Sequence, residues 1–305
     1  MKILIAGASG FIGQHLVPFL TKNHDITILG RSIAKLKRCF PQQKAINWND
    51  LKSEPVADYQ LVINLCGESI ANKRWTKQQK IKILQSRIET TTTLCRWALT
   101  SQKPQSLRFL NASAVGIYGL NTKHNTEDTP INKQPRCFSQ HIVNTWEATV
   151  KKNLDSHLSY TLMRFGVVLK KQCGMLQKLE LPYKLGMAST LGDGKQLISW
   201  VHIDDLIHAI SFIIDHPQLS GPVNIVSPET PTQKQFATIL TKALHRPYFL
   251  KTPAFFIKLL FGQMGEELLL SGQEVTSKRL KEAGFIFQYQ TLTKAIFHEY
   301  RQTVC

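Results

Sequence analysis

The sequence predicts an α/β fold, a doubly wound parallel sheet with a smaller C-terminal domain, from three observations. Residues 1–31 contain a short apolar run, a glycine-rich loop, a helical stretch and a second apolar run, the order of a strand–helix–strand crossover. Further short apolar runs alternate with helical stretches, as in parallel sheets whose crossovers are helices. The chain has 305 residues, 43% of them hydrophobic, which is enough for one such domain and an appendage.

The first crossover carries the pattern of a dinucleotide-binding loop. Residues 2–6 are an apolar run typical of a strand buried on both faces, and residues 25–29 are a second. Between them Gly7 permits a tight turn, Gly10 lets a pyrophosphate approach the backbone, and Gly13 lets the helix lie close to the sheet. Free N–H groups at the helix start would hold the phosphates. The expected cofactor contacts in this loop are Gly7, Ser9, Gly10, Phe11, Ile12 and Gly13. The alternative is a glycine-rich turn that binds nothing.

The residues after the second strand indicate which dinucleotide binds. An NAD site usually has an acidic residue about 20 residues after the loop, whereas a basic residue there suits the 2′-phosphate of NADP. This chain reads Leu29-Gly30-Arg31-Ser32, with no acidic residue. The planar guanidinium of Arg31 would pair with the phosphate, and the Ser32 hydroxyl would donate a hydrogen bond to it. The sequence therefore favours NADP(H), and a solvated arginine in a loop is the alternative.

The later strands place further residues at the cofactor edge. These strands are expected at residues 44–46, 60–64, 107–112, 158–165 and 222–226. Ligands of a doubly wound sheet lie at the carboxyl ends of its strands, so the segment Leu65-Cys66-Gly67-Glu68 is expected to line the cofactor. Gly67 permits close backbone approach and Glu68 would contact the ribose, unless the segment is a plain loop. Val167, which follows the strand at 158–165, is expected at the same edge.

Helical stretches separate and follow these strands. They are expected up to residue 22 after the glycine loop, and at about residues 33–40, 75–100, 138–154 and 232–244, with two amphipathic helices at 255–261 and 266–270. One of Asp204 and Asp205 is expected to cap a helix that ends near residue 215. We interpret His202 as a histidine held in a strand-to-helix turn, in preference to a catalytic residue.

The composition favours a cytoplasmic protein. Six cysteines without paired spacing favour reduced thiols over disulfides or a zinc site, and ten histidines show no ligand pattern. The chain begins with a core strand and has no apolar run of membrane-spanning length, so we expect neither a signal peptide nor membrane insertion. The net charge of +17 is spread over many helices, so we expect a solvated basic surface and no specific nucleic-acid partner.

Several motifs together resemble the extended short-chain dehydrogenase/reductase superfamily of nucleotide-sugar epimerases and dehydratases. They are Gly7-x-x-Gly10-x-x-Gly13, Asn64-Leu65-Cys66-Gly67, Ser113 with Tyr118-Gly119, and Trp200-Val201-His202-Ile203-Asp204-Asp205. More narrowly, the whole chain is similar to the epimerase-like proteins that have been labelled cell-division inhibitors. This likeness is carried by Glu68-Ser69-Ile70, Arg74-Trp75, Ser86-Arg87-Ile88, the segment from Ser113 to Tyr118, the segment from Gly265 to Gln273, and Ala283-Gly284-Phe285.

The resemblance implies the domain organisation and the cofactor. It implies a Rossmann domain at residues 1–228 that binds NADP(H), with residues 166–199 contributing to the substrate side. It also implies a small C-terminal domain at residues 229–305 that closes the substrate cleft. The implied substrate is a small molecule that is poorly defined for this group, and the oligomeric state stays open.

The catalytic pair of the superfamily is missing from this chain. Its working enzymes use a tyrosine as acid/base and a lysine four residues later, because a phenol with an ordinary pKa of about 10 needs a nearby cation to act near neutrality. No tyrosine here has a lysine four residues later. When the helix is aligned by Glu147, the two positions fall near Ser139 and Val143. The epimerase-like subfamily shares this departure.

Two residues after the fifth strand are candidates for the reaction. Ser113 is expected to orient a substrate oxygen, and Tyr118 is either a substitute acid/base or a structural tyrosine. Glu147 is either a proton-transfer group or a solvated or capping carboxylate. The leading hypothesis is an NADP(H)-dependent oxidoreductase or epimerase acting on an unidentified small molecule. The alternative is an NADPH-binding regulatory protein that acts through a partner.

Overall fold

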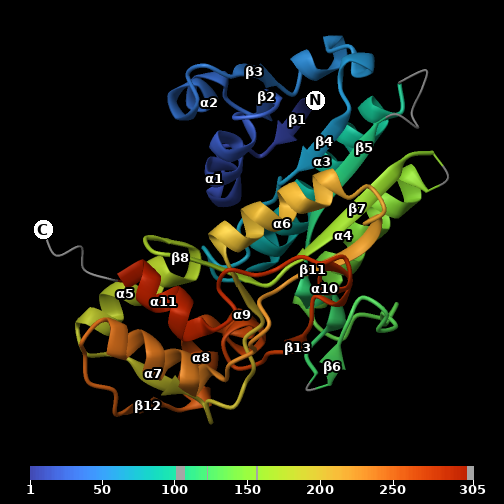
Figure 1. Ribbon diagram of the computed structural model, residues 1–305. Coiled ribbons are helices and arrows are strands. Elements are labelled where there is room, and N and C mark those ends of the chain that lie inside the picture. The colour runs from blue at the N-terminus through green and yellow to red at the C-terminus, as the bar shows by residue number, and fades with distance from the viewer. Residues whose placement is uncertain (101–106, 122, 156, 301–305) are drawn as a thin grey trace, which may run out of the picture.

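A seven-stranded parallel sheet organises the fold (Figure 1). The computed structural model describes residues 1–100, 107–121, 123–155 and 157–300. The strands, in the spatial order β3-β2-β1-β4-β5-β7-β11, are Lys44–Asn47, Asp25–Gly30, Lys2–Ala6, Leu61–Asn64, Arg108–Ala114, Ser159–Phe165 and Gly221–Ile225. The order reverses at β1, which pairs in parallel with β2 on one side and with β4 on the other, and β4 pairs in parallel with β5. The predicted doubly wound sheet is confirmed, and its switch point is the place where ligands bind in such folds.

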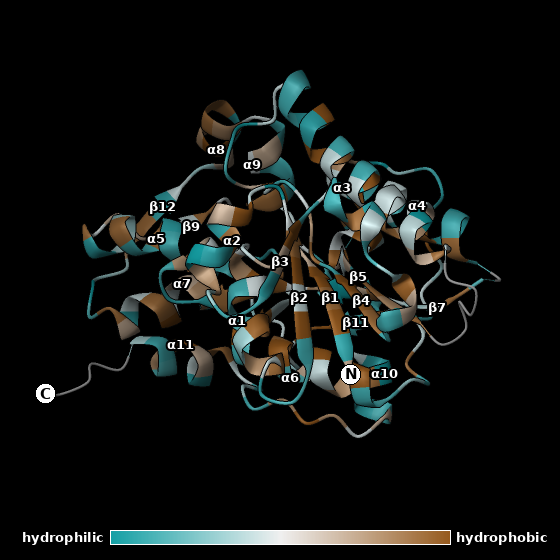
Figure 2. Ribbon diagram, turned by 90° about the horizontal axis from the view of Figure 1, so that it is seen from above, coloured by the Kyte–Doolittle hydropathy of each residue, from teal (hydrophilic) through white to brown (hydrophobic). Residues whose placement is uncertain are grey.

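Helices cover both faces of the sheet, as the continuous apolar strands require. They are α1 (Phe11–Leu20), α2 (Ile33–Cys39), α3 (Lys77–Ala98), α4 (Phe138–Leu154) and α6 (Ile203–Asp215). In β1, Ile3 and Ile5 pack in the apolar cluster with α1 and α6, whereas Leu4 and Ala6 pack in the cluster with α3 and α4. Figure 2, which looks at the strands from above, shows the hydrophobic sheet between these helices.

The α6 cap differs from its prediction. The predicted aspartate cap is wrong, because the imidazole Nδ1 of His202 accepts the hydrogen bond from the Asp204 N–H at 3.2 Å. Asp205 is buried and instead accepts hydrogen bonds from the backbone N–H groups of Gln288 and Tyr289, at 2.7 and 2.8 Å. The aspartate therefore joins α6 to the C-terminal segment.

The second half of the chain adds a smaller layer beside the sheet (Figure 1). Its helices are α5 (Gly174–Lys184), α7 (Gln233–Ala243), α8 (Ala254–Phe261), α9 (Gln263–Leu268), α10 (Lys278–Glu282) and α11 (Leu292–Tyr300). Two of its short parallel pairs are β8 (Val167–Lys170) with β10 (Trp200–His202) and β9 (Ser189–Leu191) with β12 (Leu250–Thr252). A third pair joins its β13 (Glu274–Val275) to β6 (His124–Asn125) of the first half. An apolar cluster joins α5, α7 and α11 to Leu169 and Trp200.

Two tail helices differ in position or character from the prediction. Helix α8 ends at Phe261 because Gly262 takes a left-handed backbone with φ of 58°, and α9 then begins at Gln263, earlier than the predicted residue 266. Within α8 only Ile257 is buried, so it is not the ordinary amphipathic helix that was predicted.

The described cysteines agree with the expectation of reduced thiols. Cys39, Cys66, Cys95, Cys137 and Cys173 are free thiols, and Cys305 lies outside the described residues. Among the helices of the described ranges, none is both long and apolar enough to cross a membrane. Over the same ranges, no three His, Cys, Asp or Glu side chains gather in a way that could hold a metal ion.

Candidate functional site

The glycine loop is wound tightly between β1, α1 and the segment after β4. Gly7 has φ of 84°, and a Cβ on it would lie 2.8 Å from the carbonyl carbon of Leu65. A Cβ on Gly13 would lie 2.4 Å from the carbonyl oxygen of Ala8. The Gly10 N–H donates to the Gly7 carbonyl at 3.0 Å, which closes the turn. Backbone contacts at Gly7 and Gly13 therefore leave no room for a side chain, so packing alone requires glycine at these two positions.

The start of α1 is open for an anion. Gly10 is the exposed N-cap residue and contributes no side-chain cap, and the first turn contains no acidic residue. Ser9, Phe11 and Ile12 are partly buried around it. The uncapped N–H groups and the positive end of the helix dipole are the donors that a pyrophosphate needs. The predicted loop residues therefore lie together in a cradle that fits a dinucleotide pyrophosphate.

Arg31 and Ser32 lie at the carboxyl end of β2, next to this cradle. Arg31 is exposed, and Ser32 caps α2 by accepting a hydrogen bond from the Lys35 N–H at 3.3 Å. The Ser32 hydroxyl proton is left for another acceptor. Burial raises the pKa of the Cys66 thiol to about 12, while the nearby charge of Arg31 opposes this rise. Cys66 is thus a protonated thiol at neutral pH, and Arg31 lies close enough to act on the segment after β4.

The segment after β4 is held by α3. Its Glu68 N–H donates to the Ser86 hydroxyl at 2.9 Å, and its Glu68 carbonyl accepts from the Arg87 guanidinium at 3.0 Å. Gly67 leaves room for that guanidinium, because a Cβ there would lie 3.0 Å from its central carbon. Burial lowers the pKa of Arg87 to about 10, and its guanidinium lies 5.0 Å from the centre of the Trp146 ring. Arg87 was not among the predicted site residues, although Ser86-Arg87-Ile88 is one of the motifs that carry the family likeness.

Val167 follows the end of β7 and forms the start of β8. Its side chain is 37% exposed, and its N–H donates to the Ser199 carbonyl at 2.8 Å. Like Leu65 and Gly67, it therefore lies at the carboxyl edge of the sheet, where the sequence predicted it.

A buried ion pair between α4 and β7 lies beside Ser113. The Glu147 carboxylate accepts from Arg164 Nε and Nη2 at 2.8 and 2.9 Å, and from the Ser113 hydroxyl at 2.7 Å. All three residues are at least 97% buried. The predicted reading of Glu147 as a solvated or capping carboxylate is therefore wrong, because this charge is paired in the core.

Tyr118 belongs to the same network. Its hydroxyl donates to the Asn224 side-chain carbonyl at 2.8 Å and accepts from Arg164 Nη1 at 3.0 Å. Burial raises the pKa of Tyr118 above its ordinary value, although Arg164 opposes the rise. A phenol with both hydrogen bonds satisfied and a raised pKa is a weak acid/base at neutral pH.

The positions aligned with the superfamily's catalytic pair are filled by packing. Val143 lies in an apolar cluster with Val115, Ile117 and Tyr118, next to the 3-10 turn after β5. The Ser139 N–H donates to the Glu267 carboxylate of α9 at 2.7 Å. A structural contact with the C-terminal region thus occupies the start of α4.

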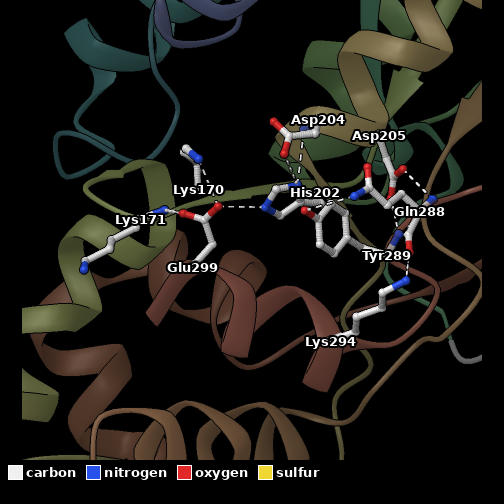
Figure 3. Close-up of polar contacts among 9 residues, drawn as sticks. All are labelled: Lys170, Lys171, His202, Asp204, Asp205, Gln288, Tyr289, Lys294 and Glu299. Atoms are coloured by element: carbon white, nitrogen blue, oxygen red, sulfur yellow. Dashed lines mark hydrogen bonds and ion pairs between the residues drawn. The ribbon is translucent and has the colours of Figure 1, made fainter. Parts of the chain in front are cut away.

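A second polar cluster ties α11 to the core (Figure 3). The Glu299 carboxylate contacts His202 Nε2 at 2.9 Å, Lys170 Nζ at 3.0 Å and the Lys171 N–H at 2.7 Å. Burial alone would raise the pKa of Glu299, but these partners hold it at about 2. His202 is completely buried at the β10–α6 junction, which confirms its interpretation as a histidine held in a strand-to-helix turn.

Comparisons with known families agree with this geometry. The profile of the NAD dependent epimerase/dehydratase family matches residues 3–226, and that of a domain of unknown function, DUF1731, matches residues 252–299. The chain is 36% identical over 295 residues to an epimerase family protein of Staphylococcus haemolyticus, covering 95% of this chain and 96% of that one. It is 34% identical over 304 residues to epimerase family protein YfhF of Bacillus subtilis, covering 97% of each.

A solved structure extends the likeness to the whole fold. The crystal structure of human epimerase family protein SDR39U1 (isoform 2) with NADPH has a TM-score of 0.88 and 28% sequence identity. The match covers 99% of this chain and 100% of the human chain. The arrangement of the sheet and of the C-terminal layer is therefore common to both proteins.

Proposed function

The chain belongs to the NAD dependent epimerase/dehydratase family, and we propose that it binds NADP(H) at the carboxyl edge of its sheet. The observation that carries this proposal is the glycine cradle, where the backbone of Leu65 and Ala8 leaves no room for side chains at Gly7 and Gly13. The similar human protein was crystallised with NADPH, which supports the choice of cofactor. In this proposal residues 1–228 bind the cofactor, residues 229–305 close the cleft, and the free thiols support a cytoplasmic place of action.

Arg31 is the proposed determinant of NADP(H) over NAD(H). It is exposed beside the cradle, carries no carboxylate partner among the described residues, and is followed by a serine with a free hydroxyl proton. We expect Arg31→Asp to weaken NADPH binding about 10- to 100-fold and to leave NADH binding little changed, because only NADPH carries the 2′-phosphate. Calorimetric titration of both nucleotides measures this difference.

A matched control separates local from general electrostatics. Arg96→Asp makes the same charge change on the exposed face of α3 and is expected to leave both affinities unchanged. Equal weakening of NADPH and NADH by Arg31→Asp would show that Arg31 does not contact the 2′-phosphate.

We further propose that the protein acts as an oxidoreductase or epimerase on a small molecule bearing a hydroxyl or carbonyl group. NADP(H), when bound, would supply or accept the hydride. Ser113 donates its proton to Glu147, so its oxygen lone pairs are free to accept a hydrogen bond from a substrate hydroxyl. Arg164 holds the Glu147 carboxylate in place at 2.8 Å, and Ser113 acts by orienting the substrate.

One observation favours a second candidate, an NADPH-binding regulatory protein without turnover. Ser139 and Val143 occupy the positions of the usual tyrosine and lysine, and both are buried in structural contacts. A screen of carbonyl compounds and nucleotide sugars for NADPH consumption distinguishes the candidates. Turnover that Ser113→Ala reduces supports the enzyme, whereas NADPH binding without turnover on any compound supports the regulatory protein.

A further inference from the structure

Helix α8 presents apolar side chains to solvent along nearly its whole length. Phe255, Leu259 and Leu260 are 61%, 68% and 60% exposed, and Phe256 and Phe261 are exposed as well. Figure 2 shows this helix as a hydrophobic segment at the outside of the molecule, beside α9. Solvated surfaces of soluble domains rarely gather so many large apolar side chains on one short helix. The surface made by these five residues, here called the α8 face, is therefore suited to contact with something other than water.

A basic pocket lies directly beside the α8 face. The pocket has a volume of about 450 Å³ and is lined by Lys73, Arg74, Thr76, Gln78, Gln79 and Lys82, at the start of α3. The guanidinium of Arg74 donates to the Leu259 carbonyl at 3.2 Å, which joins the pocket to α8. Within the described ranges, Lys73, Arg74 and Lys82 form no ion pair with a carboxylate. The pocket therefore offers positive charge next to exposed hydrocarbon.

The charge distribution decides which occupant fits. A second copy of the chain would bring another net charge of +17 toward a surface that is already basic. Glu266, the acidic residue nearest to α8 in the sequence, is already paired with Lys258 at 2.8 Å. An anionic bilayer supplies both required chemistries, because its phosphates attract lysine and arginine while its acyl boundary accepts aromatic and leucine side chains.

We propose that the α8 face and the basic pocket dock this protein onto a membrane surface rich in anionic phospholipid. The apolar side chains of α8 enter the boundary between headgroups and acyl chains, and the pocket binds lipid phosphates. The attachment is peripheral, with α8 lying in the plane of the interface. This docking is independent of the proposed cofactor, so its failure would leave NADP(H) binding untouched.

Vesicle flotation tests both parts of the surface. The full chain is mixed with vesicles of phosphatidylglycerol and phosphatidylcholine in equal parts, or with pure phosphatidylcholine. We expect binding to the anionic vesicles and little binding to the neutral ones. Phe255→Glu with Leu259→Glu is expected to weaken anionic binding roughly tenfold or more, and Lys73→Gln with Lys82→Gln is expected to do the same.

Matched controls carry the same changes elsewhere on the surface. Ile286→Glu changes an apolar residue that is 80% exposed after α10, and Lys151→Gln with Lys152→Gln removes two exposed charges from α4. Both controls should bind anionic vesicles as the parent chain does. Thermal unfolding of every variant shows whether the fold is kept. We expect all variants to fold, because every substituted residue is exposed.

Three outcomes would overturn the proposal. The first is absence of binding to anionic vesicles by the parent chain. The second is equal weakening by the α8 variants and the controls, which would indicate general attraction by net charge. The third is a dimer in analytical ultracentrifugation without lipid that becomes monomeric with Phe255→Glu and Leu259→Glu, which would make the α8 face an interface between copies.

Discussion

The first crossover and the region around Ser113 differ in how the chain builds them. The cofactor cradle comes from one continuous stretch, in which Gly7, Gly13 and Arg31 occupy positions fixed by a strand–helix–strand unit. The region around Ser113 instead joins side chains from β5, α4 and β7, and its charges are paired with each other inside the core. The N–H groups at the start of α1 have no side-chain cap and can donate to a ligand, whereas the hydrogen bonds of Glu147 and Arg164 are made within the protein.

The two regions therefore tolerate substitution differently. A glycine at a backbone contact has no substitute, because the adjacent carbonyl leaves no space for a Cβ. A buried side chain such as Val143, by contrast, fills space in an apolar cluster, so another apolar side chain of similar volume can take its place.

The largest effect is expected at the buried pair of Glu147 and Arg164. Glu147→Gln leaves Arg164 buried without its charge partner, so the free energy of unfolding should fall by about 3–5 kcal/mol. Urea denaturation measures this loss, and the double variant with Arg164→Met should recover part of it. If Glu147→Gln instead keeps its urea midpoint and abolishes a measured turnover, Glu147 is a proton-transfer group and the structural account of the pair fails.

The next effect breaks the cradle. Gly13→Ala places a methyl group against the Ala8 carbonyl, so α1 must move away from β1 and its N–H groups leave the pyrophosphate. We expect NADPH affinity to fall about 100-fold and stability to fall by about 1–3 kcal/mol. Gly116→Ala is the control, because its Cβ would lie at least 3.6 Å from its neighbours and should be tolerated. Unchanged NADPH affinity in Gly13→Ala would place the cofactor elsewhere.

A third effect concerns Glu299, whose carboxylate joins α11 to the core and has all its partners within the protein. The pKa of Glu299 is lowered to about 2, so its contribution is present above its ordinary pKa near 4.5 and is lost as pH falls toward 2. We expect parent and Glu299→Gln to differ by about 2 kcal/mol in the free energy of unfolding near neutrality, and to converge in acid. Urea unfolding across this pH range measures the difference, and a gap that stays constant with pH would exclude the ionised carboxylate as its cause.

The smallest effect separates capping from cofactor recognition. Ser32→Ala removes the hydroxyl that caps α2, which should cost about 1 kcal/mol of stability at this exposed helix end. NADPH affinity should fall by less than in Arg31→Asp, because a neutral hydrogen bond contributes less than a charged one. Calorimetry and thermal unfolding of the same variant give the two values, and a loss of NADPH affinity as large as that of Arg31→Asp would contradict this ranking.

The sequence predicted the sheet and the cradle because their signals are local. Each strand of the sheet is a short apolar run, and the glycines lie between two of them within a few turns of chain. Hydrophobic periodicity and the positions of the glycines were therefore enough to predict the strands and the loop. The free thiols agree with the prediction from unpaired cysteine spacing over the described residues.

The buried charges could not be predicted in the same way. Glu147 and Arg164 lie on different elements, and a helical glutamate is ordinarily solvated, so only the packing of α4 on β7 reveals the pair. The cap of α6 was assigned to an aspartate because aspartate is a frequent N-cap residue. The observed cap is His202, and its ring is held by Glu299, which lies nearly one hundred residues later in the sequence. Helices α5, α10 and α11 were also missed, since their apolar faces are short and are completed by long-range contacts.

The most direct test of the central claim is a calorimetric titration of the folded parent chain with NADPH and with NADH. The account predicts saturable binding of one NADPH per chain and weaker binding of NADH, with the difference removed by Arg31→Asp. No heat with either nucleotide, in its oxidised or its reduced form, would contradict the claim that the glycine cradle holds a dinucleotide.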